Sequence, residues 1–378
     1  MKRRMLIALS ALMVLAMLVT SCAQVPAAAP AQQEVVEVMV EVTRIVEVPA
    51  EGGEAPPAAV AQKMLNIVQD RGKLVCGGRT DLVGFGYLDS EGNNIGFDTD
   101  LCRAVATAIF GDPTAAEIVP LTAAERGPAL QTGEIDLLSR NVTWTSSRDA
   151  QWGNFTTVMF YDGQGMMVRG DSGATTLEDL DGATVCVTTG TTTEKNLADA
   201  FRERGLEFTA VTFEDTSAVY GAYEDGRCDA ATSDKSQLAA VRSGFANPDD
   251  HMIMDITMSK EPLTPAVPTG DSQWFDIVKS VMWVLINAEE LGVTSANVDE
   301  MMNSENIPVR RMLGVEGSFG QEDLGLSTDF AVNVIKAVGN YGEIYDRYMG
   351  PDGAAFTLPR GQNELWSKGG LIYAPPLR

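Results

Sequence analysis

The chain of 378 residues contains a single histidine, His251. Histidine is the side chain that most often serves as a general acid or base near neutral pH, and it is a common zinc ligand. This one lies in the turn-forming segment NPDDHM, where we expect an exposed side chain. No pair of carboxylates stands out as a substitute acid and base. The scarcity of histidine therefore argues against an enzyme, a metal site or another cofactor.

Basic residues are few compared with acidic ones. The chain has 28 lysines and arginines against 52 aspartates and glutamates, which gives a formal net charge of −24. Nucleic acids and anionic lipid head groups are negatively charged, and a strongly acidic protein repels them. We therefore expect neither as a partner. A small anionic ligand is still compatible with this charge if its pocket is locally basic.

Long apolar runs are missing except at the N-terminus. There, an apolar stretch at 5–19 follows three basic residues at 2–4, which predicts a signal peptide over residues 1–21. Cys22 comes directly after Thr-Ser and resembles a bacterial lipobox cysteine, so we expect cleavage before it and lipid attachment to its sulfur. An uncleaved anchor is the alternative. No other run reaches the roughly 18–20 residues of a membrane helix, which argues against a channel or permease.

Residues 22–63 are predicted to form a flexible acidic tether. Their ends are rich in alanine, proline, glycine and glutamate, and the middle, 34–48, alternates valine with glutamate. Alternation with a period of two can indicate a strand, but no partner strand is obvious, so we expect an extended spacer. A flexible coil of this length would hold the body about 35 Å from the membrane.

The remaining residues, 64–378, first alternate strand-like and helix-like segments. We expect strands at 73–77, 117–121, 135–139, 183–188, 208–213 and 229–233. We expect helices at 98–110, where Asp98 can act as a cap, and at 123–131, 193–204, 218–226 and 236–243. This alternation predicts an α/β fold with mostly parallel sheets. The length is too great for one core, so two lobes are expected. Beyond residue 270 the pattern is helical, at 276–290, 295–303 and 328–349.

Four cysteines remain in the body of an exported protein, and they allow three disulfide pairings. Sequence order and the two-lobe organisation favour Cys76–Cys102 and Cys186–Cys228, one in each lobe. Each bond would close a loop of a few tens of residues and stabilise the fold by roughly 3–4 kcal/mol. A metal site is the alternative, but none of the four cysteines has CxxC spacing.

The stretch DLLSRNVTWTSSRD at 136–149 concentrates polar side chains at the end of an apolar strand. It contains two arginines, Arg140 and Arg148, together with several hydroxyl groups. A planar guanidinium pairs best with a carboxylate, through two parallel hydrogen bonds. The stretch is therefore a candidate anion-binding site, and a surface loop with one salt bridge is the alternative.

Several motifs follow one another in a characteristic order. They are LNIVQDRGKLVCGGR, GFDTDLCRAVATAIFGD, LTAAERGPALQTGEIDLLSRNVTWTSSRD, YDGQG, GATVCVTTGTTTEKNLAD, YEDGRCDAATSDKS and INAEELG. This order resembles the bacterial family 3 solute-binding proteins of amino-acid ABC importers, with the closest likeness to the general L-amino-acid-binding branch. The resemblance implies a two-lobe, periplasmic-binding-protein-like fold of type II. Two crossing strands would join the lobes, which close on an amino acid in the cleft. Lobe 1 would comprise 64–166 and 264–378, including a helical C-terminal extension, and lobe 2 would comprise 167–263.

The resemblance also implies roles for individual residues. Arg148 matches the arginine that grips the α-carboxylate, and Asp234 matches the acid that receives the α-ammonium group. Asn141 and Thr143 match polar positions of lobe 1 that support these contacts. Thr192 matches a position of lobe 2 at the start of a helix, where unpaired N–H groups suit an anion. Helix capping is the alternative role for Thr192 and Asp234.

The side-chain end of the pocket departs from the family pattern. Leu82 stands where many members have an aromatic residue, which leaves Phe85 as the candidate for stacking on the ligand. Arg79 and Arg126 fall where acidic-amino-acid binders hold the side-chain carboxylate, and Arg140 is a further candidate cation. These arginines favour glutamate, aspartate or their amides, although a broad specificity is also compatible. Structural ion pairs are the alternative for Arg79 and Arg126.

Together these features predict an exported, lipid-anchored protein that captures an L-amino acid by lobe closure and delivers it to the permease subunits of an ABC importer. We expect a monomer without cofactors, at the outer face of the cytoplasmic membrane or in the periplasm. The membrane would be contacted through the lipid alone. The alternatives are an extracellular sensor domain and, less favoured, a dehydratase-like enzyme on the same fold.

Overall fold

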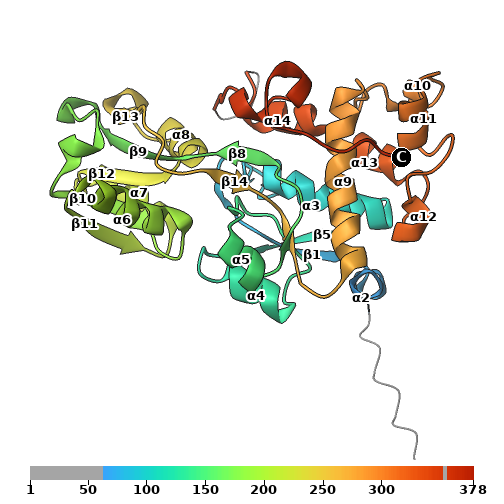
Figure 1. Cartoon of the computed structure of the whole chain (residues 1–378), viewed down its shortest axis with the longest axis horizontal. Coiled ribbons are helices and arrows are strands. Elements are labelled where there is room, and N and C mark those ends of the chain that lie inside the picture. Colours follow the sequence, from blue (N-terminus) through green and yellow to red (C-terminus); the bar gives the residue numbers. More distant parts are fainter. Residues whose placement is uncertain (1–62, 352–355) are drawn as a thin grey trace, which may run out of the picture. The chain divides into compact units, whose positions relative to one another are not determined.

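The computed structural model describes residues 63–351 and 356–378. The predicted signal peptide, the predicted lipidation site Cys22 and nearly all of the predicted tether lie outside the described residues. The body consists of two α/β lobes joined by two strands, as Figure 1 shows. The predicted fold is therefore confirmed.

Lobe 1 is built on a five-stranded sheet with the order β5-β1-β6-β15-β7. Its strands are β1 (Leu74–Gly78), β5 (Ala116–Pro120), β6 (Leu137–Leu138), β7 (Asn154–Phe155) and β15 (Ala266–Val267). The first three are mutually parallel, whereas β15 is antiparallel to β6 and β7. A three-stranded sheet of β2 (Asp81–Leu82), β3 (Gly86–Leu88) and β4 (Asn94–Ile95) completes the strands of this lobe. The chain thus leaves lobe 1 after β7 and returns at β15.

The helices of lobe 1 surround this sheet and form the C-terminal extension. The first group is α2 (Met64–Arg71), α3 (Phe97–Phe110), α4 (Arg126–Thr132) and α5 (Ser146–Gln151). The second group is α9 (Ser272–Glu290), α10 (Val298–Met301), α11 (Ile307–Met312), α12 (Gln321–Leu324), α13 (Phe330–Val338) and α14 (Tyr341–Met349). The long helix α9 is anchored at its start by Trp274, which is fully buried and donates from Nε1 to the carbonyl of Asp136 at 2.8 Å.

Lobe 2 has its own five-stranded sheet, with the order β11-β10-β12-β9-β13. The strands are β9 (Gln164–Arg169), β10 (Ala183–Thr188), β11 (Phe208–Phe213), β12 (Ala230–Asp234) and β13 (His251–Ile253). Its helices are α6 (Thr192–Arg204), α7 (Thr216–Glu224) and α8 (Lys235–Ser243). The strands β10, β11 and β12 are mutually parallel, and β9 is antiparallel to β12. Strand β13 is antiparallel to β9 and therefore runs in the same direction as the first three. Because β9 already belongs to this sheet, lobe 2 begins slightly before residue 167.

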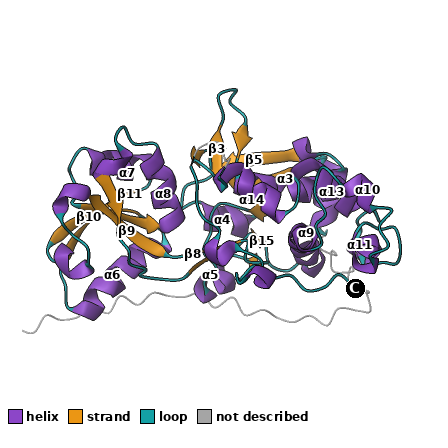
Figure 2. Cartoon of the chain, turned by 90° about the horizontal axis from the view of Figure 1, so that it is seen from above, coloured by secondary structure: helices purple, strands orange, loops and turns teal. Residues whose placement is uncertain are grey.

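Two strands connect the lobes, as the resemblance implied. They are β8 (Phe160–Asp162) and β14 (Glu261–Leu263), which pair antiparallel with Glu261 opposite Asp162. Figure 2 shows β8 in the region between the two lobes. Both predicted disulfides are present, Cys76–Cys102 in lobe 1 and Cys186–Cys228 in lobe 2.

Three local predictions were wrong. His251 is not an exposed turn residue, because it begins β13, is half-buried and lies 3.1 Å from the hydroxyl of Tyr223. The predicted helix 328–349 is two helices, because Gly339 has φ +86° and ends α13, and Asn340 then starts α14 with a capping box to Glu343. Asp98 does not cap α3, whose N-cap position is Gly96. The Asp98 carboxylate instead accepts hydrogen bonds from the loop after β6.

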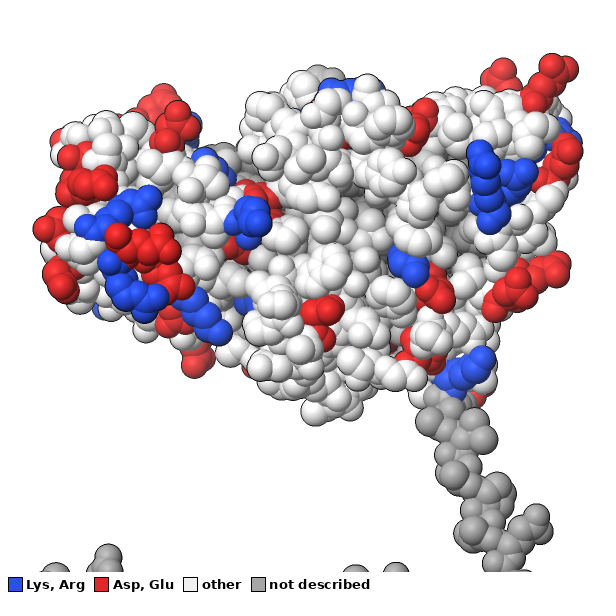
Figure 3. Space-filling view, in the orientation of Figure 1, with Lys and Arg blue, Asp and Glu red and all other residues white. Residues whose placement is uncertain are grey.

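No helix within residues 63–351 and 356–378 is both long and apolar enough to cross a membrane. The space-filling view in Figure 3 shows charged side chains mostly on the outer parts of both lobes, with acidic and basic groups interspersed. The face in this view carries no continuous basic patch. The arginines predicted to bind a ligand are largely buried inside the molecule.

Candidate functional site

A cavity with about 360 Å³ of empty space, including its opening to solvent, is lined by residues of both lobes. Lobe 1 contributes Arg79, Ala123, Arg126, Arg140, Asn141 and Thr143. Lobe 2 contributes Thr188, Thr191, Thr192, Thr193, Thr216, Ser233, Asp234 and Gln237. Every lining residue except Ala123 is polar or charged. The lining contains all the predicted ligand residues except Arg148 and Phe85.

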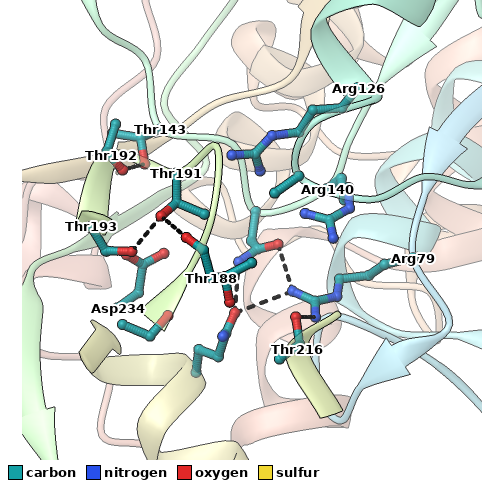
Figure 4. A pocket seen from close by; sticks show the side chains of 14 residues that line it. Arg79, Arg126, Arg140, Thr143, Thr188, Thr191, Thr192, Thr193, Thr216 and Asp234 are labelled. Atoms are coloured by element: carbon teal, nitrogen blue, oxygen red, sulfur yellow. Dashed lines mark hydrogen bonds between the residues drawn. The ribbon is translucent and has the colours of Figure 1, made fainter. Parts of the chain in front are cut away.

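The strand order explains how distant residues meet here. Arg79 follows β1, Thr188 ends β10 and Asp234 ends β12, and the carboxyl ends of parallel strands meet at one edge of a sheet. The edges of the two sheets face the same cavity. Thr192 begins the 13-residue helix α6, whose first N–H groups have no partner within the helix. Figure 4 shows the three arginines on one side of the cavity, with Thr216 beside Arg79. Asp234 lies on the other side with Thr143, Thr191, Thr192 and Thr193.

Arg79 connects the two lobes and has few donors left for a ligand. Its Nε donates to Asp81 at 2.8 Å, and its Nη1 donates to Asn141 Oδ1 at 3.0 Å and to Gln237 Oε1 at 3.2 Å. Its Nη2 donates to Thr216 Oγ1 at 3.1 Å. Because Gln237 and Thr216 belong to lobe 2, the hydrogen bonds of Arg79 connect the two lobes.

Arg126, unlike Arg79, has no hydrogen bond from its guanidinium to the described residues. It is 4 % exposed. Its closest aromatic neighbour is Trp152, whose ring centroid lies 5.9 Å from Cζ. Burial, and then the charges of Arg148 and Arg140, hold the pKa of Arg126 well below its ordinary value. Buried polar groups in folded proteins nearly always have a hydrogen-bond partner. Because Arg126 lines the cavity, an anion bound there could accept its hydrogen bonds.

Arg140 also keeps most of its donors free. Its Nε donates to the carbonyl of Leu121 at 2.5 Å, which is the one hydrogen bond its guanidinium makes to a described residue. Burial, reinforced by the charge of Arg79, lowers the pKa of Arg140 to about 9, so it is a cation at neutral pH. Arg140 and Arg126 together provide a concentrated positive charge on the lobe 1 side of the cavity.

Arg148 lies beside the cavity and is not among its lining residues. Its guanidinium stacks over the ring of Trp152 at 4.6 Å, and Nη1 donates to the carbonyl of Thr143 at 3.1 Å. Burial lowers the pKa of Arg148 to about 10, while the charges of Glu261 and Asp234 act in the opposite direction. The remaining donors of Arg148 are therefore available near Thr143.

Asp234 supplies the buried negative charge. It occupies the N-cap position of α8 but makes no capping hydrogen bond, so the alternative role as a cap does not describe its side chain. Burial raises its pKa well above the ordinary value, and the charges of Asp162 and Glu261 raise it further. Burial also raises the pKa of Asp162 to about 6. A bound cation next to Asp234 would relieve this unfavourable concentration of negative charge.

The threonines of the cavity divide the capping and binding roles. Thr191, not Thr192, caps α6 by accepting the N–H of Glu194 at 3.1 Å. The hydroxyl of Thr192 instead donates to Glu261, as does that of Thr143.

The sequence analysis missed Glu261, Gln237 and Asp162. Gln237 lies three residues after Asp234 on the helix that Asp234 begins, and this i, i+3 spacing could have indicated it. No comparable signal marked the other two residues, whose importance comes from the pairing of the crossing strands.

Phe85 does not line the cavity, so stacking of its ring on a ligand is not supported. The ring is 1 % exposed and packs edge-on against Phe160 at 5.2 Å and Phe97 at 6.4 Å. Phe85 therefore belongs to the core of lobe 1. Leu82, which stands where many family members have an aromatic residue, is buried as well.

The comparisons with known proteins agree with this architecture. The model of the bacterial extracellular solute-binding proteins, family 3, matches residues 74–351. The chain is 51 % identical over 323 residues to the general L-amino acid-binding periplasmic protein AapJ of Rhizobium johnstonii, which covers 85 % of this chain and 94 % of that protein. It is 44 % identical over 322 residues to the glutamate/glutamine/aspartate/asparagine-binding protein BztA of Rhodobacter capsulatus, with 85 % and 95 % covered.

A solved structure is similar over the same region. It is an ABC transporter periplasmic binding protein from Brucella ovis with glutathione bound, 47 % identical to this chain, with a TM-score of 0.81. The match covers 84 % of this chain and 100 % of that chain. All three relatives are named as binding proteins, which supports the prediction that the chain is not an enzyme. On this evidence the chain belongs to family 3 of the bacterial extracellular solute-binding proteins.

Proposed function

We propose that the protein captures an L-amino acid between its lobes and delivers it to the permease of an ABC transporter. The observation that carries this proposal is the division of charge around one cavity, with buried arginines on one side and buried Asp234 on the other. A zwitterion has the matching pair of charged groups. AapJ and BztA each match 85 % of this chain, and their names support the same class of ligand.

The cavity suggests an orientation for the amino-acid head. The α-carboxylate would lie near Arg148 and the first N–H groups of α6, since a helix N-terminus and a free guanidinium both attract anions. The α-ammonium group would contact Asp234, whose negative charge has no cationic hydrogen-bond partner in its own lobe. Both head groups would then be shielded from water by the lobes.

We further propose that the preferred ligand has a second carboxylate. The lining contains three arginines, Arg79, Arg126 and Arg140, against the single acid Asp234. Arg79 is already paired with Asp81 at 2.8 Å. A neutral zwitterion leaves the remaining positive excess, of Arg126 and Arg140 over Asp234, uncompensated, whereas glutamate or aspartate adds one negative charge. Arg126 and Arg140 have the free donors for this carboxylate, while those of Arg79 are mostly engaged. The side-chain role that the resemblance gave to Arg79 is therefore reassigned mainly to Arg126 and Arg140.

A glutamyl peptide is a second candidate ligand. A further cavity, with about 610 Å³ of empty space including its opening, shares Arg79, Arg140 and Thr216 with the first one. A ligand longer than glutamate could extend past these residues. The glutathione in the Brucella ovis structure is such a glutamyl peptide.

Lipid attachment at Cys22 remains part of the proposal. It is supported by the basic and apolar segments before Cys22. Mass spectrometry of the membrane-extracted protein would detect a diacylglyceryl group on Cys22 if the proposal is correct. An N-terminus other than Cys22 would contradict it.

Isothermal titration calorimetry with L-amino acids and glutathione tests the ligand proposal. We expect binding of L-glutamate and L-aspartate and weaker binding of their amides. We expect little binding of D-glutamate, because its side-chain carboxylate would point away from Arg126 and Arg140 when its head groups contact Arg148 and Asp234. The absence of heat for every L-amino acid would contradict amino-acid binding. Saturable binding of glutathione, but not of glutamate, would favour the peptide candidate.

A further inference from the structure

Glu261 is a buried carboxylate that accepts hydrogen bonds from both lobes. It lies on the crossing strand β14 and is 1 % exposed. From lobe 1, the hydroxyl of Thr143 donates to it at 2.5 Å. From lobe 2, Thr192 Oγ1 donates at 2.9 Å and Asn196 Nδ2 at 2.8 Å, and Ser259 Oγ, close by on the same segment, donates at 2.5 Å. Glu261 does not line the cavity, so it has no direct place in the proposed ligand contacts.

The hydrogen bonds of the Glu261 carboxylate depend on the distance between the two lobes. Thr143 Oγ1 and Thr192 Oγ1 lie 3.3 Å apart although they come from different lobes. Glu261 can accept from both hydroxyls only while the lobes are close together. If the lobes separate, the buried carboxylate loses at least one charge-assisted hydrogen bond, and such bonds are stronger than those between neutral groups.

We propose that Glu261 is a positioning residue that favours the closed arrangement of the lobes before any ligand binds. It acts through Thr143 and Thr192, which are pulled toward each other by a common acceptor. Arg79 makes the corresponding contacts on another side of the cavity, to Gln237 and Thr216. Glu261 differs from Arg79 because it stands on the connecting strand itself, where it contacts both lobes without belonging to either sheet.

A second consequence rests on the proposed function. A hydroxyl has one proton to donate, and Thr143 and Thr192 each direct it toward Glu261. Toward the cavity they can therefore offer lone pairs only. Glu261 makes these two threonines acceptors, which suits the ammonium group of a ligand rather than its carboxylate. The hydroxyl of Thr192 cannot donate to a ligand carboxylate while it donates to Glu261. The anion-binding role that the resemblance implied for Thr192 therefore falls to the N–H groups at the start of α6.

The closure proposal can be tested without any ligand. The distance between the lobes can be measured by electron paramagnetic resonance on the full chain, with spin labels at Ser90 in lobe 1 and Glu203 in lobe 2, both exposed. Labels carried on non-natural amino acids leave the native disulfides intact. We expect Glu261→Ala to lower the ratio of closed to open molecules roughly ten- to a hundredfold, the effect of losing charge-assisted hydrogen bonds from both lobes. Glu261→Gln, which keeps one acceptor oxygen, should give an intermediate ratio.

Two further variants separate closure from general destabilisation. Asp136→Ala removes a carboxylate that is equally buried but has its contacts, to Arg71 and Val75, within lobe 1, and it should leave the interlobe distance unchanged. The double variant Thr143→Val with Thr192→Val leaves Glu261 in place and should open the lobes as Glu261→Ala does, even if that variant folds poorly. Identical distance distributions in the wild type, Glu261→Ala and the double variant would overturn the proposal. Failure of amino-acid binding would leave this result unaffected, so the two proposals can fail separately.

Discussion

The carboxylate of Asp98 accepts a hydrogen bond from the backbone N–H of Asn141 at 2.6 Å and thereby fixes the loop that carries Arg140 into the cavity. Asn141 has φ +37°, the one positive φ of a non-glycine residue in the described part of the chain. The hydroxyl of Ser139 donates to the other oxygen of Asp98 at 3.4 Å. The start of α3 thus supports a strained backbone conformation at the site.

Asp98→Ala should weaken ligand binding, although Asp98 does not line the cavity. The change leaves the buried N–H of Asn141 without its acceptor, which costs about 1–3 kcal/mol. We expect both a lower thermal unfolding temperature and a dissociation constant raised about tenfold, measured by calorimetry. Asp112→Ala is the control, because Asp112 is an exposed acid whose carboxylate accepts hydrogen bonds from Thr114 at the surface. Unchanged affinity in Asp98→Ala would show that the loop does not depend on this contact.

Arg148→Ala should strongly weaken the binding of every amino acid, because the α-carboxylate loses its guanidinium partner. The expected loss is about 2–5 kcal/mol of binding free energy. Calorimetry at millimolar ligand would detect the residual affinity. Arg103→Ala serves as the control, since this arginine pairs with Asp100 away from the cavity. If Arg148→Ala binds as tightly as the wild type, another arginine holds the α-carboxylate.

The sequence allowed the two lobes, the strand alternation and both disulfides to be predicted, because each depends on local pattern or on order along the chain. The break at Gly339 was missed because apolar residues at helical spacing continue on both sides of it. Asp98 was predicted to cap a helix, but its carboxylate supports the loop after β6 instead. This role could not be predicted because it depends on a hydrogen bond from Asn141, which is more than forty positions away in the sequence.

The site was predictable to a similar degree. The resemblance identified most of the residues that line the cavity, but it could not show which donors are already occupied. Arg79 and Arg126 look equivalent in the sequence. In the structure Arg79 donates to Asn141, Gln237 and Thr216, whereas Arg126 has no hydrogen-bond partner among the described residues. The difference between the two arginines arises because Gln237 and Thr216 of lobe 2 lie close to Arg79. No local sequence pattern indicates this contact between the lobes.

Amino-acid affinity should rise with pH as Asp234 titrates, above the ordinary pKa of an aspartate. The pKa of Asp234 is raised by burial and by Asp162 and Glu261, and a bound ammonium group would lower it. The complex then holds fewer protons than the free protein, so binding releases protons and is favoured as pH rises. Calorimetry in two buffers of different ionisation enthalpy would measure the release.

Asp98 and Asp162, whose pKa values are raised to about 6 by burial, titrate in the same range. The variant Asp234→Asn isolates the contribution of Asp234. It should bind more weakly at pH 8 and show a smaller dependence of affinity on pH. A proton release identical to that of the wild type would assign the effect to another group.

Removal of the lobe 2 disulfide should destabilise the protein without altering the site. Cys186 and Cys228 are 42 residues apart, and their bond joins β10 to the segment just before β12. Cys186→Ala with Cys228→Ala should lower the free energy of unfolding by about 3–4 kcal/mol in the chain-entropy model. Denaturant titration measures this value, and ligand affinity under native conditions should be unchanged. A loss below about 0.5 kcal/mol would contradict the chain-entropy account for this bond.

The comparison of L-glutamate with L-glutamine tests the central claim most directly, because the two ligands have nearly the same shape and differ by one charge. Calorimetry at pH 7.5 on the wild type and on Arg126→Gln would give four dissociation constants. We expect the wild type to bind glutamate at least about tenfold more tightly than glutamine, and Arg126→Gln to lose most of that preference. Equal affinities for glutamate and glutamine in the wild type, or a preference that survives in Arg126→Gln, would contradict a second carboxylate site at Arg126.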